Sequence, residues 1–135
     1  MCKSVLRSGP WDREPNSKSW ESHGFICNVV RNRSAGHLCG YVSIPSTHPC
    51  YGKFENDDLL SVIDVHGGIT WSRNIHPKLK VDTGIWWLGF DCGHYGDIVP
   101  LKLNYGSCMS GDTYKNFEYV TKQVNNLAKQ LSEIK

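Results

Sequence analysis

Short apolar segments with alternating faces recur along the first two thirds of the chain. Glycines, prolines and polar turn residues separate them, and the segments lie at residues 25–30, 37–44, 61–66, 69–72 and 85–91. Alternation over four to eight residues is typical of a half-buried β-strand. The pattern therefore predicts an antiparallel sheet of about five strands, with one hairpin from 25–30 and 37–44 and a second one that turns at Gly67-Gly68.

Segment 85–91 differs from the other predicted strands because it is apolar on both faces. Such a strand is expected to have a neighbour on each side. Residues 45–60 contain Pro45, Pro49 and Gly52, and they predict a loop that ends in a solvated acidic segment. After Gly93 the chain is expected to stay irregular, apart from a short extended piece near 99–103.

From residue 112 the spacing of apolar residues changes to steps of three and four. Asp112 or Thr113 is the expected helix cap. The apolar stripe consists of Phe117, Val120, Val124, Leu127, Leu131 and Ile134. We expect the helix to pack on the sheet, although the same stripe would also allow helix pairing between two subunits of a homo-oligomer. The predicted fold class is α+β, an antiparallel sheet of about five strands with a long C-terminal amphipathic helix.

The N-terminal segment is polar, contains two prolines, and holds Trp11 and Trp20. It is expected to be an irregular arm that these aromatic rings attach to the body of the protein. A length of 135 residues suits one domain. We therefore predict a single domain over 1–135, with an irregular arm at 1–23, the sheet and its loops at 24–103, and the helix at 112–134.

Composition narrows the classes of partner and compartment. The formal net charge is only +2 and the charges are interspersed, so direct nucleic-acid binding is not expected. The chain contains six cysteines, but its first residues include no apolar signal-peptide core, which argues against a disulfide framework. No apolar run approaches the roughly 20 residues of a membrane-spanning helix. We expect a soluble cytoplasmic protein with reduced thiols and no membrane partner.

The first candidate site lies at the end of predicted strand 61–66. Alternation places Asp64 and His66 on one face, and Gly67-Gly68 leaves backbone open to a ligand. A carboxylate beside an imidazole can orient the imidazole, raise its basicity or bind a metal. The alternative is an ordinary hairpin end, in which Asp64 caps a turn and His66 is half buried.

The second candidate site follows predicted strand 85–91. Asp91, His94 and Asp97 are spaced by three through Gly93 and Gly96, so their side chains can converge on one side of a turn whose amides could bind an anion. These three side chains could bind a divalent metal as a cofactor, or they could act as acid and base in cleavage of a phosphoester. Alternatively, the two aspartates bind their own turn amides.

The two candidate sites are expected to share one pocket, with Trp87 and Tyr95 as stacking surfaces beside it. Cys92 is expected to be a buried, unreactive thiol, and the cysteine spacing disfavours a structural zinc site. If the protein is an enzyme, His66, His94 and Asp91 are the candidate catalytic residues. The predicted ligand-binding set is Asp64, His66, Gly67, Gly68, Trp87, Asp91, Gly93, His94, Tyr95 and Asp97.

The order of these motifs resembles a family of small uncharacterised bacteriophage and prophage proteins. The resemblance runs over nearly the whole chain, through Gly-Pro-Trp at 9–11, Cys-Gly-Tyr-Val at 39–42, Asp-Val-His-Gly-Gly-Ile-Thr at 64–70 and Trp-Trp-Leu-Gly-Phe-Asp-Cys-Gly-His at 86–94 with Asp97. In the family pattern a small residue such as alanine often stands in place of Gly93. The resemblance implies an accessory phage protein that acts in the cytoplasm of an infected bacterium.

Three functions fit these observations. The first is sequestration of a small nucleotide-derived ligand, such as a host defence signal, without turnover. The second is a metal-dependent or His/Asp-dependent phosphodiesterase that acts on such a nucleotide. The third is an interaction protein that blocks a host enzyme through an aromatic surface.

Overall fold

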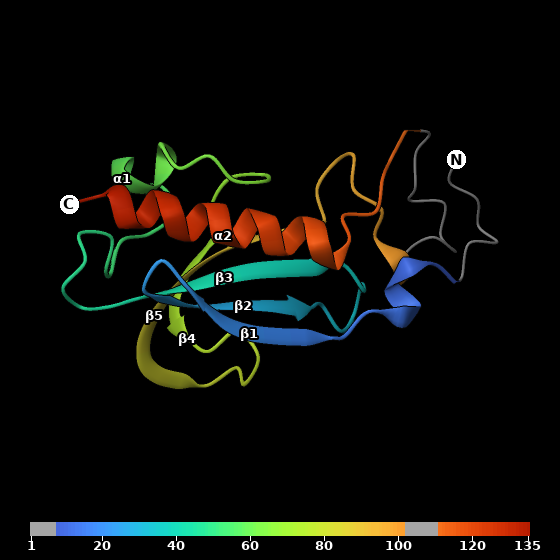
Figure 1. Ribbon diagram of the computed structural model, residues 1–135, viewed down its shortest axis with the longest axis horizontal. Coiled ribbons are helices and arrows are strands. Elements are labelled where there is room, and N and C mark those ends of the chain that lie inside the picture. The colour runs from blue at the N-terminus through green and yellow to red at the C-terminus, as the bar shows by residue number, and fades with distance from the viewer. Residues whose placement is uncertain (1–7, 102–110) are drawn as a thin grey trace.

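The computed structural model describes residues 8–101 and 111–135. One antiparallel sheet of five strands packs a single face against a long C-terminal helix, which confirms the predicted α+β class (Figure 1). The elements in chain order are η1 (Pro10–Arg13), β1 (Ser17–Ser22), β2 (Phe25–Arg31), β3 (Leu38–Ile44), α1 (Asp58–Ser61), β4 (Trp71–Ile75), β5 (Asp82–Asp91) and α2 (Phe117–Glu133).

The strands are arranged in the order β1-β2-β3-β5-β4, and every neighbouring pair is antiparallel. The predicted hairpin of β2 and β3 is confirmed. Strand β5 lies between β3 and β4, as its apolar residues on both faces predicted. It is longer than expected, because it begins at Asp82 and bends where its register with β4 shifts between Arg73 and Ile75.

Strand β1 corrects the prediction of an irregular arm at 1–23. It pairs with β2 through a two-residue turn, in which His23 and Gly24 have φ of 51° and 85°. Its sequence gave little hydrophobic signal, because it lies at the margin of the sheet and only Trp20 packs against the core. Strand formation here depends on pairing with β2 rather than on intrinsic preference.

The predicted strand at 61–66 and its glycine hairpin are both wrong. Asp57 caps the short helix α1 by accepting a hydrogen bond from the amide of Leu59, and the chain then runs irregularly to β4. Ile63 and Val65 are still buried in the core, so the alternation of the segment correctly predicted its inward face. Gly68 closes a tight turn by donating to the Val65 carbonyl.

Side chains of α2 take the place of a neighbouring strand along this segment. The side-chain carbonyls of Gln130 and Gln123 accept hydrogen bonds from the amides of Asp64 and His66, both at 2.9 Å. The Asp64 carbonyl accepts from the side-chain amides of Gln130 and Asn126. The helix therefore satisfies backbone groups that a sheet ladder would otherwise pair.

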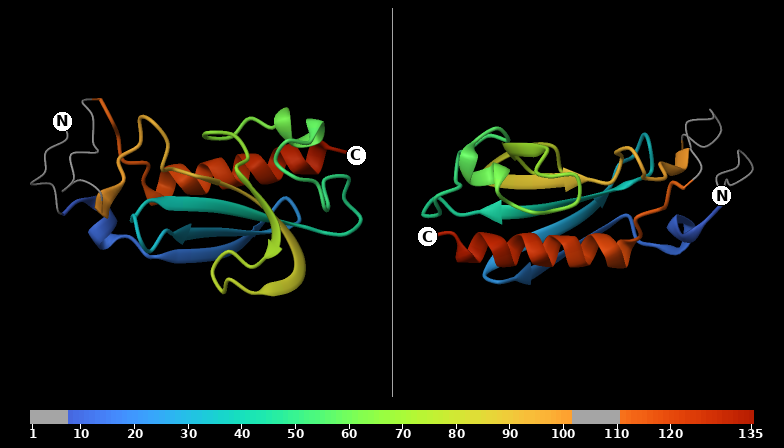
Figure 2. Two further views of the ribbon diagram at one scale, coloured as in Figure 1. Left: turned by 180° about the vertical axis from the view of Figure 1, so that it is seen from behind. Right: turned by 90° about the horizontal axis from the view of Figure 1, so that it is seen from above.

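Helix α2 begins at Phe117, not at residue 112 or 113 as predicted. Asn116 is its cap and accepts a hydrogen bond from the amide of Tyr119 at 2.8 Å. The helix lies along β2 and β3, as the views in Figure 2 show. Packing on the sheet is thereby confirmed for the apolar stripe, whose buried members are Val120, Val124, Leu127, Ala128 and Leu131.

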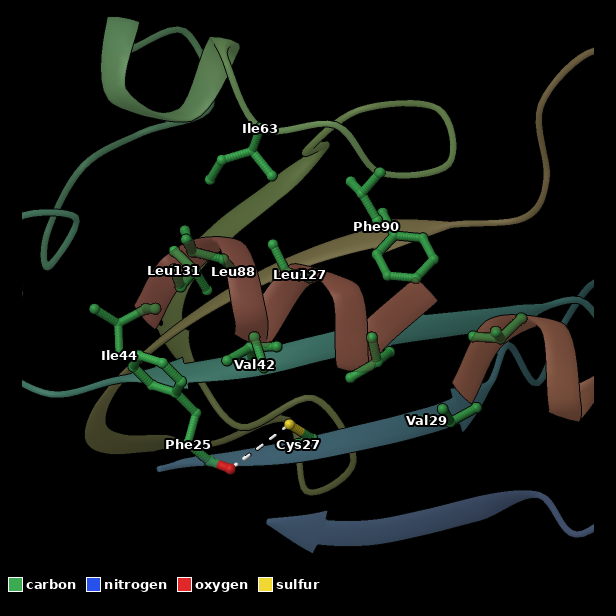
Figure 3. Close-up of a cluster of buried hydrophobic side chains, with 14 of the residues drawn as sticks. Phe25, Cys27, Val29, Val42, Ile44, Ile63, Leu88, Phe90, Leu127 and Leu131 are labelled. Carbon is green, nitrogen blue, oxygen red and sulfur yellow. Dashed lines mark hydrogen bonds between the residues drawn. The ribbon is translucent and has the colours of Figure 1, made fainter. Parts of the chain in front are cut away.

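The main core fills the space between α2 and the sheet (Figure 3). Strand residues Val42, Leu88 and Phe90 meet the helix here, and none is more than 1 % exposed. Gly40 is required at the centre, because a Cβ there would lie 2.5 Å from Val124 Cγ2. The close approach of helix and sheet therefore depends on a missing side chain.

The opposite face of the sheet carries a smaller buried cluster of Cys39, Tyr41 and Trp87. Trp71 packs edge-on against Tyr41, and His76 packs edge-on against Trp87, with ring centroids 5.2 and 5.3 Å apart. His76 belongs to the turn between β4 and β5, so this turn folds back over the sheet. This packing explains why aromatic residues on the uncovered face remain buried.

Residues near the N-terminus connect directly to the start of α2. Glu14 lies 3.2 Å from the guanidinium of Arg31 and accepts a hydrogen bond from the amide of Phe117 at 2.8 Å. Arg31 also donates to the hydroxyl of Tyr114 at 3.0 Å, and Trp11 packs edge-on against that ring. The aromatic attachment predicted for this segment is therefore present, although part of the segment is strand.

Three further expectations concern the rest of the chain. Cys27, Cys39, Cys50 and Cys92 are free thiols, while Cys2 and Cys108 lie outside the described residues. The extended piece predicted near 99–103 is not seen at 99–101, and its last two residues also lie outside that range. Among residues 8–101 and 111–135, no helix has both the length and the apolar character needed to span a membrane.

Candidate functional site

The end of β5 and the segment before β4 meet at two histidines. The ring centroids of His66 and His94 are 6.3 Å apart. The turn at 91–97 is tied to the chain before α2, because the Ile98 amide donates to the Thr113 carbonyl and the Thr113 amide donates to the Gly96 carbonyl. Both candidate sites therefore form one cluster beside the first turn of the helix.

Both ring nitrogens of His66 have partners. Nε2 lies 2.9 Å from Oδ2 of Asp97, and Nδ1 lies 2.8 Å from the hydroxyl of Tyr119. Asp97 can only accept when ionised, so Nε2 of His66 donates to it. Nδ1 of a neutral ring then accepts the hydroxyl proton of Tyr119, and every polar atom of this ring is used.

Asp97 is the centre of this network, and its side chain is only 1 % exposed. In addition to His66, it accepts a hydrogen bond from the amide of His94 at 3.0 Å and forms an ion pair with Lys115 at 3.0 Å. Burial opposes ionisation of Asp97. The hydrogen bonds from His66, Lys115 and the His94 amide outweigh this effect and hold the pKa of Asp97 below its usual value.

His94 is held more loosely than His66. Its Nε2 lies 3.0 Å from Oδ1 of Asp91, but outside hydrogen-bond geometry, and its side chain is 37 % exposed. The ring lies against Gly67, where a Cβ would approach Cδ2 and Nε2 to 2.6 Å. Gly67 also has φ of 70°, so both its backbone conformation and its missing side chain favour glycine.

Asp91 and Asp97 also bind amides of their own turn, as the alternative interpretation expected. Asp91 accepts from the Gly93 amide at 3.0 Å, and Asp97 accepts from the His94 amide. These amides are therefore not open for an anion. A Cβ at Gly93 would lie 3.1 Å from His37, so this glycine makes room for that ring.

Two members of the predicted ligand set do not fit the expected arrangement. Asp64 does not share a strand face with His66, because the segment is not a strand, and its hydrogen bonds to α2 are made by its backbone. Trp87 is 2 % exposed and lies in the cluster on the other face of the sheet, so it cannot stack on a ligand beside His94. Tyr95, by contrast, is 90 % exposed next to His94, and Gly68 lies in the turn next to Gly67.

Sequence reasoning missed the residues that α2 and its approach contribute. Lys115 and Tyr119 both contact the Asp97–His66 pair, and Gln123 binds the backbone of His66. A signal for them was present, because Tyr119, Gln123, Asn126 and Gln130 are spaced by four, three and four. This spacing places polar hydrogen-bonding groups in one line along the helix, next to the apolar stripe.

Other potential reactive groups are poorly placed for chemistry. Cys92 is 1 % exposed, and burial raises the pKa of its thiol, as the prediction of an unreactive cysteine required. Within the described parts of the chain, no group of three or more His, Cys, Asp or Glu side chains is arranged to hold a metal ion. Two surface hollows lie away from the cluster, one lined by residues 8–13 and the other between residues 23–49 and the end of α2.

His66, Asp97, Lys115 and Tyr119 thus form a compact polar cluster at the turn 91–97. Tyr95 of the same turn is exposed. Comparisons with family models, curated proteins and solved structures give no match to this chain.

Proposed function

We propose that this protein binds and sequesters a small nucleotide-derived ligand on the turn at 91–97, without turnover. The observation that carries the proposal is the saturation of His66, whose two ring nitrogens are both taken by Asp97 and Tyr119. A histidine with neither nitrogen free cannot exchange a proton with a ligand without breaking this network. The network therefore acts as a rigid support for the turn.

The groups that face solvent on this support suit a nucleotide. Tyr95 presents an exposed ring on which a base can stack. Beside it, the His94 side chain is 37 % exposed and adds a second ring, although its Nε2 is buried and faces Asp91. The His94 ring covers the Cβ side of Gly67, so a ligand on the turn would meet this ring before the main chain beneath it.

The remaining polar groups of the cluster also favour binding over turnover. Burial raises the pKa of Tyr119, with smaller contributions from Cys92 and Asp97, so its hydroxyl stays protonated and is a poor nucleophile. Lys115 is engaged by Asp97 and by the Thr113 hydroxyl and carbonyl. In the biological setting implied by the motif resemblance, such a protein would sequester a defence signal in the cytoplasm of an infected bacterium.

Hydrolysis is the second candidate, and one observation favours it. The hydrogen bonds that link Tyr119 to His66 and His66 to Asp97 have the connectivity of a hydroxyl–imidazole–carboxylate triad. In that case His66 would be the base and Tyr119 the group that it activates. The raised pKa of Tyr119 weighs against this role, and a search for reaction products separates the two candidates.

The test mixes purified protein with cyclic dinucleotides and cyclic ADP-ribose isomers, with and without Mg²⁺ or Mn²⁺, and measures binding by calorimetry. Each mixture is then heat-denatured, and the supernatant is analysed by chromatography. Recovery of the intact nucleotide supports sequestration, whereas a cleaved nucleotide supports hydrolysis. If none of these nucleotides binds, the proposal is overturned in favour of a protein that blocks a host enzyme.

A matched pair of variants locates the binding surface. Tyr95→Ala should weaken nucleotide binding about 5- to 150-fold, in line with a stacking contribution of about 1–3 kcal/mol. Tyr51→Ala is the control, because Tyr51 is also exposed but packs near Trp86, away from the turn at 91–97. Equal affinities of the two variants would place the ligand elsewhere on the protein.

A further inference from the structure

The backbone of β1 presents hydrogen-bonding groups to the outside of the sheet. The carbonyl of Asn16 accepts from the Arg31 amide at 2.8 Å, which shows that Asn16 faces β2. Alternation along the strand then points the backbone amides and carbonyls of Lys18, Trp20 and Ser22 toward β2 as well. The outward-facing amides and carbonyls therefore belong to Ser17, Ser19 and Glu21.

The next strand gives an independent check of this assignment. Ile26 is the β2 partner of Glu21, and its amide donates to the Ser43 side chain on β3 rather than to β1. Glu21 and Ile26 are thus a pair that exchanges no backbone hydrogen bonds. The free groups of Glu21 consequently point away from the sheet, as the alternation requires.

Among the described residues, no strand pairs with the outer side of β1, although Lys18 and Glu21 place two charges on this margin. Its register with β2 is continuous over all six residues from Ser17 to Ser22, whereas the other margin, β4, has a register shift. The strand contains no proline, and helix α2 packs mainly over β2 and β3 and contacts β1 through Trp20, whose indole donates to Asn125 at 2.8 Å. An edge with a continuous register of this kind can act as a template for another strand.

We propose that β1 is a homodimer interface, in which two copies of this chain pair their β1 strands antiparallel into one continuous sheet. The register follows from the outward groups, because a two-fold axis at Ser19 lets all three outward residues pair. Ser17 then lies opposite Glu21 of the partner subunit, and Ser19 lies opposite Ser19 of the partner subunit. Other registers use fewer of these residues.

Charge supports the same register. With the axis at Ser19, Lys18 lies opposite Trp20 of the partner subunit, and no like charges face each other. Moving the axis to Lys18 or to Glu21 would oppose two lysines or two glutamates, which destabilises strand pairs. Lys18 Nζ already lies 5.5 Å from the ring centroid of Trp20 within one chain, so the lysine in the dimer lies between two indole rings.

The pairing also differs from the helix-mediated dimer that the apolar stripe first suggested. That stripe is buried against the sheet of the same chain, whereas in residues 8–101 and 111–135 no strand pairs with the outer side of β1. The dimer requires no movement of α2 and no ligand. It therefore stands or falls independently of the proposed nucleotide binding.

Sedimentation velocity of the full chain from 1 to 500 µM tests the proposal. The wild-type protein should shift from monomer to dimer within this range. Ser19→Pro removes the central outward amide without removing a bond to β2, and it should remain monomeric at every concentration. Ser19→Ala keeps that amide and should dimerise like the wild type.

A second variant covers the case in which Ser19→Pro fails to fold. Ser19→Lys keeps the amide but opposes two lysines on the two-fold axis, and it should weaken dimerisation at least tenfold. Its midpoint of thermal unfolding should equal that of the wild type at about 1 µM, where both are monomeric. A wild-type chain that is monomeric up to 500 µM would overturn the proposal. So would a Ser19→Lys variant that dimerises as tightly as the wild type.

Discussion

The two histidines of the cluster each lie beside an aspartate, but one pair is buried and the other is partly exposed. His66 pairs with a carboxylate that is 1 % exposed and uses both ring nitrogens, whereas His94 pairs with Asp91, whose side chain is 36 % exposed. A buried, saturated pair holds its surroundings in place, while an exposed pair contributes little to stability. Two adjacent His–Asp pairs can thus differ widely in what they contribute to the fold, and only the exposed pair belongs to the proposed binding surface.

The largest effect that separates the two pairs is expected from their carboxylates. Asp97→Ala leaves His66, Lys115 and the His94 amide without their common partner in a buried position. We expect a loss of about 3–5 kcal/mol in the free energy of unfolding, measured by urea denaturation. Asp91→Ala should cost less than about 1 kcal/mol, and equal losses would contradict the distinction.

Replacement of the histidines themselves should give a smaller difference in the same direction. His66→Leu removes two hydrogen bonds and leaves Tyr119 and Asp97 partly unsatisfied, which should cost about 2–3 kcal/mol. His94→Leu should change the free energy of unfolding by less than about 1 kcal/mol but weaken nucleotide binding. Chemical denaturation of both variants checks this order, and a greater loss for His94→Leu would reverse it.

The glycines beneath the histidines allow a finer comparison. Gly67 and Gly68 have φ of 70° and 77°, but only at Gly67 would a Cβ meet another residue, at 2.6 Å from the His94 ring. Gly68→Ala should cost about 1 kcal/mol from its backbone alone, and Gly67→Ala about 2 kcal/mol. When His94→Ala is added, the loss caused by Gly67→Ala should fall to the value expected for Gly68→Ala. An unchanged loss would show that the His94 ring is not the obstacle.

The smallest predicted effect is the change in the free energy of unfolding with pH, which is absent near neutral pH and appears only in acid. Because the folded-state pKa of Asp97 is lowered, its ionised form contributes stability above the unfolded-state pKa of about 3.9. This contribution is lost as the pH falls through the folded-state pKa. The stability difference between wild type and Asp97→Asn should stay constant from pH 7 to 5 and shrink below about pH 4. Urea denaturation across this range measures it, and a difference that does not change with acidification would contradict the lowered pKa.

Much of the fold was predictable because burial leaves a periodic signature. The alternation in β2 and β3, the apolar second half of β5 and the stripe on α2 all reflect contact with the main core. Strand β1 left no such signature, since a polar edge strand owes its structure to its neighbour. Segment 61–66 left a misleading one, because its alternation reflects burial whereas helix amides satisfy its backbone.

The candidate site was predictable where a glycine turn followed an apolar segment. This pattern correctly placed His66 beside His94, since both turns end at the same end of the core. It could not identify Tyr119 or Lys115, which lie far away in the sequence and reach the site only through the position of α2. Trp87 was misplaced for a simpler reason, since a strand that is apolar on both faces does not indicate which face carries the site.

The contacts of Glu14 and Arg31 with Phe117 and Tyr114 join the two ends of the described chain. Synthesis must therefore pass through α2 before the core can close. Leu131 leaves the ribosome 40 residues after the last residue of β5, an interval of about 2–8 seconds at roughly 5–20 residues per second. Throughout that interval the apolar face of the sheet has no cover, so the nascent chain is a ready target for chaperones, and a product truncated before α2 will aggregate rather than fold.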